Sequence, residues 1–195
     1  MSKVKIAMMV SGGGTNMQAV IDAIEKGKIH GEIKVVISSN PKAYALERAK
    51  LHKIEAVYIG KEQSAEEIKE KILQVLEEKE IELIVLAGYM SILDKTIIEQ
   101  YKNRIINIHP SLIPSFCGKG FYGKKVHQAA LDYGVKVTGA TVHFVDEGID
   151  TGKIIAQEAV CIKEDDTADS LAERVLEVEH KLLPLAIQKV IENQF

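Results

Sequence analysis

The chain is poor in cysteine: only Cys117 and Cys161 are present, and they do not stand at metal-ligand spacing. A disulfide framework or a zinc site needs more cysteines in closer patterns, so we expect two reduced thiols. The chain also lacks a run of about 18 apolar residues and an apolar N-terminal segment, which argues against a transmembrane helix and a signal peptide. We therefore expect a cytoplasmic protein without a membrane partner.

An excess of charge of one sign is also missing. The formal net charge is −3 over 195 residues. Nucleic-acid-binding domains usually carry a basic patch, so we expect no nucleic-acid partner, and any anion-binding site must be local. No repeat, low-complexity segment or linker interrupts the chain. Its length suits one domain with a full core, covering residues 1–195.

The first half of the chain alternates between short apolar runs and helical periodicity. Strands are predicted at residues 4–10, 33–37, 56–59, 83–87 and 105–109. Helices are predicted at residues 16–26, 41–52, 65–79 and 95–101, with N-caps at Asn40, Ser64 and Asp94 and a capping box from Ser64 to Glu67. This alternation predicts a parallel sheet with helices on both faces.

The pattern changes after residue 109. Residues 110–126 form a loop interrupted by glycine and proline, and loops of that length are usually functional or mobile. A short helix at 126–133 precedes two long strands at 135–145 and 154–162. An amphipathic helix then runs from Thr167 to the end, with Pro184 as a kink or a break. We predict an α/β fold whose mostly parallel sheet has an antiparallel portion and a long C-terminal helix.

Three glycines, Gly12 to Gly14, precede Thr15 and Asn16 between the first predicted strand and the first predicted helix. Glycines let the backbone approach a phosphate closely, and a helix N-terminus offers free N–H groups and a positive dipole end. The segment is neither a Walker loop nor a dinucleotide-binding Gly-x-Gly-x-x-Gly. Taken by itself, the segment is also compatible with a tight turn in which Thr15 or Asn16 is the helix N-cap; together with the motifs described below, we favour a phosphate site.

The segment from Asn107 to Pro114 contains an amide, an imidazole and two prolines at the end of an apolar strand. Asn107 and His109 are two residues apart, so on an extended backbone they point to the same face. They would supply a neutral hydrogen-bond donor and a group that titrates near neutrality. A strand end whose Asn caps a turn and whose His is a surface residue is the alternative.

A second polar segment, from His143 to Gly152, follows the first of the two long strands. It places Asp146, Glu147 and Asp150 in a glycine-bounded loop. A carboxylate beside an imidazole can orient the ring and raise its basicity, as acid–base catalysis requires. Taken alone, the Asp-Glu-Gly segment is more typical of a solvated turn than of a catalytic site.

In combination, the Asn-Ile-His-Pro-Ser segment at Asn107 and the Asp-Glu-Gly-Ile-Asp-Thr-Gly segment at Asp146 closely resemble the folate-dependent formyltransferase family. The glycine-rich loop narrows the resemblance to members that act on glycinamide ribonucleotide in purine synthesis. It extends from about Lys3 to the C-terminal helix. It implies a Rossmann-like three-layer domain and an enzyme that moves a formyl group from 10-formyltetrahydrofolate, its co-substrate, to the ribonucleotide amine without a metal.

The resemblance also implies roles for individual residues. The catalytic set would be Asn107, His109 and Asp150. The ribonucleotide would be held at its phosphate and ribose by Gly12, Gly13, Gly14, Thr15, Asn16 and Glu179. The folate would lie between two walls formed by Met90, Ser91, Leu93, Val145, Asp146 and Glu147. The Ile113–Pro114 peptide is expected to be cis, like the matching Leu-Pro of the family.

Some positions depart from the family pattern. Ser91 stands where many relatives have Arg, Leu176 where a polar residue is common, and Lys153 where Pro is usual. These departures concern affinity and leave the proposed catalytic set intact.

Other functions compete with this prediction. A formyltetrahydrofolate deformylase would transfer the formyl group to water, but relatives of that kind carry an additional N-terminal domain. A methionyl-tRNA formyltransferase would carry a C-terminal nucleic-acid-binding domain. A non-catalytic nucleotide-binding module would need no Asn107, His109 or Asp150. The chain as a monomer and as a homodimer are both compatible with the sequence.

Overall fold

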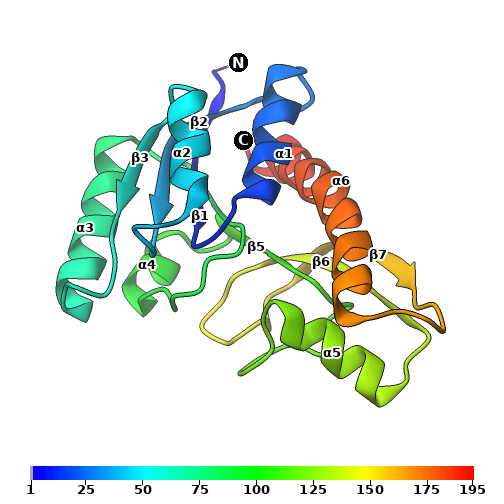
Figure 1. Cartoon of the computed structure of the whole chain (residues 1–195). Coiled ribbons are helices and arrows are strands. Elements are labelled where there is room, and N and C mark those ends of the chain that lie inside the picture. Colours follow the sequence, from blue (N-terminus) through cyan, green and yellow to red (C-terminus); the bar gives the residue numbers. More distant parts are fainter. Residues whose placement is uncertain (1) are drawn as a thin grey trace.

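A computed structural model describes residues 2–195 of the chain. Its strands form one sheet in the order β3-β2-β1-β4-β5-β6-β7 (Figure 1). The strands are β1 (Val4–Val10), β2 (Gly31–Ser38), β3 (Glu55–Tyr58), β4 (Leu83–Leu86), β5 (Ile105–His109), β6 (Val137–Phe144) and β7 (Ile154–Cys161). The first five are parallel, whereas β6 and β7 are antiparallel to their neighbours. The predicted mostly parallel sheet with an antiparallel portion is confirmed.

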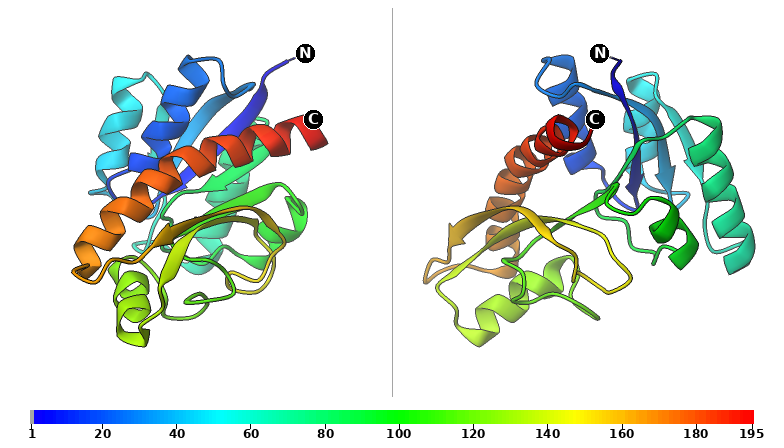
Figure 2. Two further views of the ribbon diagram at one scale, coloured as in Figure 1. Left: turned by 90° about the vertical axis from the view of Figure 1, so that its right-hand side faces the viewer. Right: turned by 180° about the vertical axis from the view of Figure 1, so that it is seen from behind.

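Helices cover both faces of the sheet, which makes three layers (Figure 2). One face packs on α1 (Thr15–Glu25), α2 (Tyr44–Leu51) and α6 (Ala168–Gln194), and the other on α3 (Ala65–Glu78) and α4 (Lys95–Gln100). Alternate residues of β1 serve the two cores: Ile6 and Met8 face the first, and Ala7 and Met9 the second. This follows from the two-residue period of a strand. A strand buried on both faces must therefore be apolar along its buried part. In β1 this part is Ile6 to Val10, and Lys5 near the strand start is only partly buried and pairs with Glu80.

Local capping decides where several helices begin. Ser64 forms the predicted capping box with Glu67, and the side chain of Asp94 accepts from Thr96 N, so both predicted N-caps are confirmed. The predicted start of the second helix at Pro41 is wrong. Asn40 Oδ1 accepts from the backbone N–H of residue 42, and its C=O accepts from that of residue 43, so a turn forms first. Helix α2 begins only at Tyr44.

In the C-terminal third one open alternative is decided, and element bounds differ from the expected ones by one or two residues, as for β6, which begins at Val137 and not at residue 135. Helix α6 runs without a break through Pro184, so two separate helices are excluded. Helix α5 (Lys124–Tyr133) begins two residues earlier than predicted, which shortens the preceding loop. Within residues 2–195, no helix combines the length and apolar character needed to span a membrane.

The strand register brings the polar segments to one edge of the sheet. Met9 of β1 pairs with Leu86 of β4, Leu86 with Asn107 of β5, and Asn107 with His143 of β6. The loops after β1, β4 and β5 therefore leave the sheet side by side. The strand order runs outward from β1 to β3 on one side and from β4 to β7 on the other, so the topological switch point lies between β1 and β4. Ligands of open α/β sheets usually bind at such points.

Candidate active site

Asn107 faces His143 across the junction between β5 and β6. Its Nδ2 lies 3.2 Å from His143 Nε2, and His143 Nδ1 lies 2.8 Å from the carbonyl oxygen of Phe144. A carbonyl can only accept, so Nδ1 carries the proton and Nε2 accepts from Asn107. The His143 side chain is 2% exposed. Asn107 thus donates one N–H to His143, and its second N–H has no acceptor among residues 2–195 and can bind another group.

His109 and Asp150 form the second half of this centre. Nδ1 of His109 lies 3.6 Å from Asp150 Oδ2, and Asp150 Oδ1 lies 3.7 Å from His143 Nε2. The carboxylate therefore lies between two imidazoles. The other ring nitrogen of His109 donates to the Phe116 carbonyl at 3.0 Å. These contacts give both rings a defined orientation.

Asp150 is held by the backbone as well. It has a positive φ of 58°, a conformation in which Asp is tolerated better than most residues, and its Oδ2 accepts from Gly118 N at 2.9 Å. Burial acts to raise the pKa of Asp150, but the His143 imidazole, the Gly118 N–H and His109 together keep that pKa below its usual value. Asp150 is therefore an anion at neutral pH.

Burial has the opposite effect on His109. It lowers the pKa of the imidazole, against the Phe116 carbonyl and the Asp150 carboxylate, which both act to raise it. The net pKa lies below the usual value, so the ring is neutral at pH 7. A neutral ring beside a carboxylate can take up a proton during a reaction and return it afterwards.

A cavity of about 470 Å³ opens in front of this centre, with Asn107, His109 and Asp150 in its wall. All six residues predicted to contact the folate also line it: Met90, Ser91, Leu93, Val145, Asp146 and Glu147. Two segments far apart in the sequence therefore line the same cavity. The volume falls within the range of about 300–1,000 Å³ that is usual for small-molecule sites.

The glycine-rich loop lies at the end of β1, at the same edge of the sheet. Gly14, not Thr15 or Asn16, is the N-cap of α1, and its φ of 73° is in the left-handed region. The two alternative N-caps are therefore wrong: a left-handed residue is needed at that position, and glycine adopts this conformation without steric cost. Within the described chain, none of the backbone N–H groups from Gly12 to Asn16 donates to a protein acceptor.

Asn16 connects this loop to the final helix. Its Nδ2 donates to Glu179 Oε2 at 2.9 Å, while its buried Oδ1 has no partner in the structure described. Glu179 is only 7% exposed, and burial raises its pKa to about 7, against the hydrogen bond from Asn16. The pair offers an acceptor on Asn16 and a carboxyl on Glu179 to a polar ligand.

The structure thus brings the predicted residues into two groups at the carboxyl ends of the parallel strands, one around the loop after β1 and one around Asn107 of β5. Neighbouring strands are about 4.8 Å apart, so β5 and β1, separated only by β4, place the loop on the order of 10 Å from Asn107. A contact between Met90 N and Ser11 Oγ, at 2.8 Å, joins the two regions. One small ligand could span both.

His143 is the residue that the sequence reasoning overlooked. It begins the second polar segment, but its side chain could be placed beside Asn107 only through the β5–β6 register. The signal available was its position seven residues before Asp150 at the end of a strand. The expected cis peptide at Ile113–Pro114 is confirmed. In residues 2–195, no group of three or more His, Cys, Asp or Glu is arranged to hold a metal ion.

Comparison with known proteins gives a family match over most of the chain. The formyl transferase family matches residues 4–187. The phosphoribosylglycinamide formyltransferase of Bacillus subtilis is 36% identical over 189 residues, which cover 96% of this chain and 94% of that protein. The chloroplastic phosphoribosylglycinamide formyltransferase of Vigna unguiculata is 37% identical over 194 residues, or 97% of this chain. The chain spans only 62% of the length of that plant relative.

Solved structures agree with these sequence matches. The glycinamide ribonucleotide transformylase 1 of Symbiobacterium toebii superposes with a TM-score of 0.92 at 38% identity, covering 99% of this chain and 90% of that one. A formyltetrahydrofolate deformylase of Pseudomonas syringae superposes with a TM-score of 0.89, but at 25% identity and over 62% of its own length.

Proposed function

Because the chain belongs to the formyl transferase family, we propose that it transfers the formyl group of 10-formyltetrahydrofolate to the amine of glycinamide ribonucleotide. The observation that carries the proposal is the position of Asn107, His109 and Asp150 in the wall of one cavity, next to a loop of unpaired N–H groups. A donor that binds the cavity and an acceptor that binds the loop would meet at Asn107.

The two ligands would occupy different walls. The phosphate of the ribonucleotide would accept from the N–H groups of Gly12 to Asn16, at the positive end of α1. Its ribose hydroxyls would contact Glu179. The pterin of the folate would lie against Met90, Leu93 and Val145, and the segment from Asp146 would close the other side. This arrangement places the formyl carbon near Asn107 and the amine beside it.

In the reaction, the amine nitrogen attacks the formyl carbon and negative charge develops on the formyl oxygen. The free N–H of Asn107 would donate to this oxygen. A single donor of this kind contributes about 3 kcal/mol to the stability of the transition state. His143 would keep the Asn107 amide in the orientation that presents N–H, because its Nε2 accepts the other hydrogen at 3.2 Å.

A proton must move from the attacking amine to N10 before the carbon–N10 bond breaks. The Asp150 carboxylate, with Oδ1 free of a backbone donor, would accept this proton directly or through a water and pass it on. His109, neutral at pH 7, would share the proton with it. The products would be the formylated amine and tetrahydrofolate.

The competing hydrolytic function has a specific basis in the similarity to the deformylase structure. The two activities differ in the formyl acceptor. Purified chain should convert 10-formyltetrahydrofolate, followed by its absorbance, only when glycinamide ribonucleotide is present. Conversion at the same rate without the ribonucleotide would support a deformylase instead. Binding of the ribonucleotide without any conversion would support a non-catalytic module.

A further inference from the structure

Helix α2 donates hydrogen bonds to two carbonyl groups of the glycine-rich loop. The Gly12 carbonyl accepts from Ala45 N at 3.1 Å, and the Gly13 carbonyl accepts from Arg48 Nε at 2.9 Å. In a planar trans peptide, the C=O of one residue and the N–H of the next point in opposite directions. Holding the two carbonyls toward α2 therefore aims the N–H groups of Gly13 and Gly14 away from it.

One of these two anchors is a backbone group, and the other is the side chain of Arg48. Three contacts hold the Arg48 guanidinium in place. Besides Gly13, it donates from Nη1 to Gln18 Oε1 at 3.3 Å, and its Cζ lies 5.1 Å from the centre of the Tyr44 ring. Gln18 is itself held by Asp22 at 2.8 Å. Such a network leaves the guanidinium little freedom.

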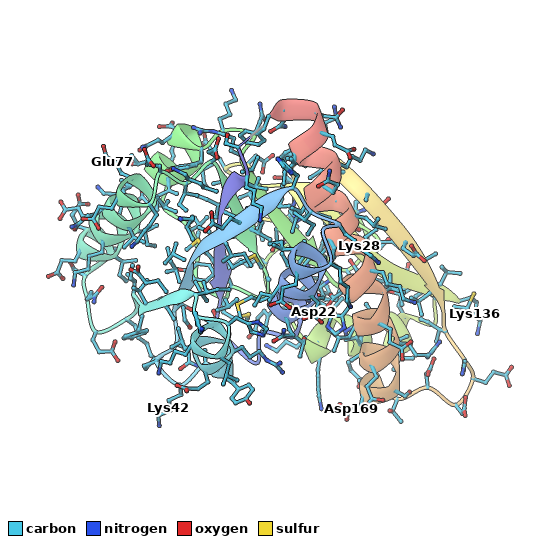
Figure 3. The ribbon with its side chains drawn as sticks, turned by 90° about the horizontal axis from the view of Figure 1, so that it is seen from above. Asp22, Lys28, Lys42, Glu77, Lys136 and Asp169 are labelled. Atoms are coloured by element: carbon cyan, nitrogen blue, oxygen red, sulfur yellow. The ribbon has the colours of Figure 1, made fainter. Side chains whose placement is uncertain are left out.

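The charge of Arg48 is also not neutralised by an ion pair. No carboxylate within residues 2–195 lies within 4.0 Å of its guanidinium, unlike that of Arg174, which pairs with Asp166. Arg48 and Thr15 both line a groove of about 1010 Å³ between α1 and α6. Figure 3 labels two further residues of this groove, Asp22 and Lys28, beside these helices. The guanidinium is thus open to this groove close to the loop.

We propose that Arg48 is a positioning residue for the ribonucleotide phosphate: it holds the Gly13 carbonyl toward α2, so that the loop N–H groups face the phosphate. Its positive charge, which no carboxylate within residues 2–195 pairs with, lies on the α2 side of the same loop. This proposal rests on the proposed phosphate role of the loop. It makes Arg48 a determinant of affinity for the anionic substrate and gives it no part in the chemical step.

The test compares Arg48→Met and Arg48→Lys with the wild-type chain. Arg104→Met is a matched control, because Arg104 also stacks on a tyrosine, Tyr101 at 4.8 Å, and donates to a backbone carbonyl, that of Gln100 at 2.8 Å. Removing Arg48 should raise the KM for glycinamide ribonucleotide about tenfold, which corresponds to about 1.4 kcal/mol. The turnover number and the KM for the folate should change by less than about twofold.

The lysine variant separates positioning from charge. Lysine keeps the positive charge but cannot reproduce the fork that bonds Gly13 and Gln18 together. We expect Arg48→Lys to retain a KM for the ribonucleotide that is raised at least about threefold. Full recovery in Arg48→Lys would reduce the role to charge alone and overturn the positioning proposal.

A second measurement does not depend on catalysis. Binding of inorganic phosphate, measured by titration calorimetry, should weaken by a similar factor in Arg48→Met and stay unchanged in Arg104→Met. If the wild-type chain failed to formylate the ribonucleotide but this difference persisted, the proposed function would fail while the Arg48 assignment stood. The Arg48 assignment would be overturned if all variants bound phosphate with equal affinity. It would also be overturned if the turnover number of Arg48→Met fell by as much as its KM for the ribonucleotide rose. If circular dichroism shows that Arg48→Met is unfolded, the same KM and phosphate-binding measurements on Arg48→Gln and Arg48→Lys test the proposal.

Discussion

The loop from Gly12 to Asn16 presents mainly backbone groups, whereas the centre around Asn107 presents side chains. The loop N–H groups are set by backbone conformation and by the packing of α2. The centre depends on Asn107, His109, His143 and Asp150, which come from β5, β6 and the segment that follows β6. A backbone site is weakened by changes in shape, while a side-chain site is lost when one functional group is removed. The two regions should therefore respond differently to substitution.

The largest effect is expected at Asp150. Asp150→Asn keeps the shape of the side chain but removes the charge between His109 and His143. Turnover should fall about a thousandfold, within the range of 10²–10⁴ that a positioned acid–base group contributes. The melting temperature should stay close to that of the wild type. Asp132→Asn, on the exposed face of α5, is the control. Near-native turnover in Asp150→Asn would reject its proposed role.

The second largest effect on turnover is expected at Asn107, the proposed hydrogen-bond donor to the formyl oxygen. Asn107→Ala removes the N–H proposed for the formyl oxygen and leaves Nε2 of His143 without its 3.2 Å partner. Turnover should decrease about a hundredfold, as expected for the loss of one such donor. Steady-state kinetics with both substrates would measure it, with Asn193→Ala on α6 as a control. A change confined to the KM values would place Asn107 in binding instead.

The third prediction concerns Glu179, which contacts Asn16 of the glycine-rich loop, and the pH dependence of folding stability. Burial raises its pKa to about 7, above the ordinary 4.5. Between these pH values the folded chain keeps a proton that the unfolded chain has released, so stability falls as pH rises through about 7. The shift corresponds to roughly 3 kcal/mol. The side chain in the Glu179→Gln variant cannot ionise, so this variant should not lose stability over the same pH range.

Urea unfolding at pH 5 and pH 8 checks this expectation. The wild-type chain should become less stable relative to Glu179→Gln at the higher pH, as a buried acid requires. Glu177→Gln, at an exposed position on the same helix, should follow the wild type at both pH values. A constant difference between wild type and Glu179→Gln would mean that the carboxyl is already ionised at pH 5.

The smallest effect is expected at Gly14. An added Cβ would lie 2.6 Å from Ala45 Cβ, and the φ of 73° disfavours any side chain. Gly14→Ala should raise the KM for the ribonucleotide about tenfold, equal to about 1.4 kcal/mol, with the folate KM unchanged. Gly12→Ala, which meets no atom within 4 Å, should fold like the wild type and thus serves as the comparison for stability. Equal increases in both KM values would contradict the phosphate assignment.

Much of the fold was accessible from the sequence because its signals are local. The five parallel strands and their order of appearance follow from apolar runs between amphipathic segments, and the caps at Ser64 and Asp94 follow from side chains close to the backbone they bond. The start of α2 was misjudged for a related reason. Asn40 and Pro41 favour a helix start and a turn alike, and the bonds from residues 42 and 43 to Asn40 select the turn.

The sequence by itself determined which chemical groups are available: a glycine-rich segment after β1, an amide and an imidazole on one face of β5, and a carboxylate in the segment after β6. Only the tertiary structure decided what these groups contact. His143 reaches Asn107 because β6 pairs antiparallel with β5 in one register, and Arg48 reaches Gly13 because α2 packs on the loop. Such contacts join residues tens of positions apart, so they depend on how the strands and helices pack, and no local pattern encodes them.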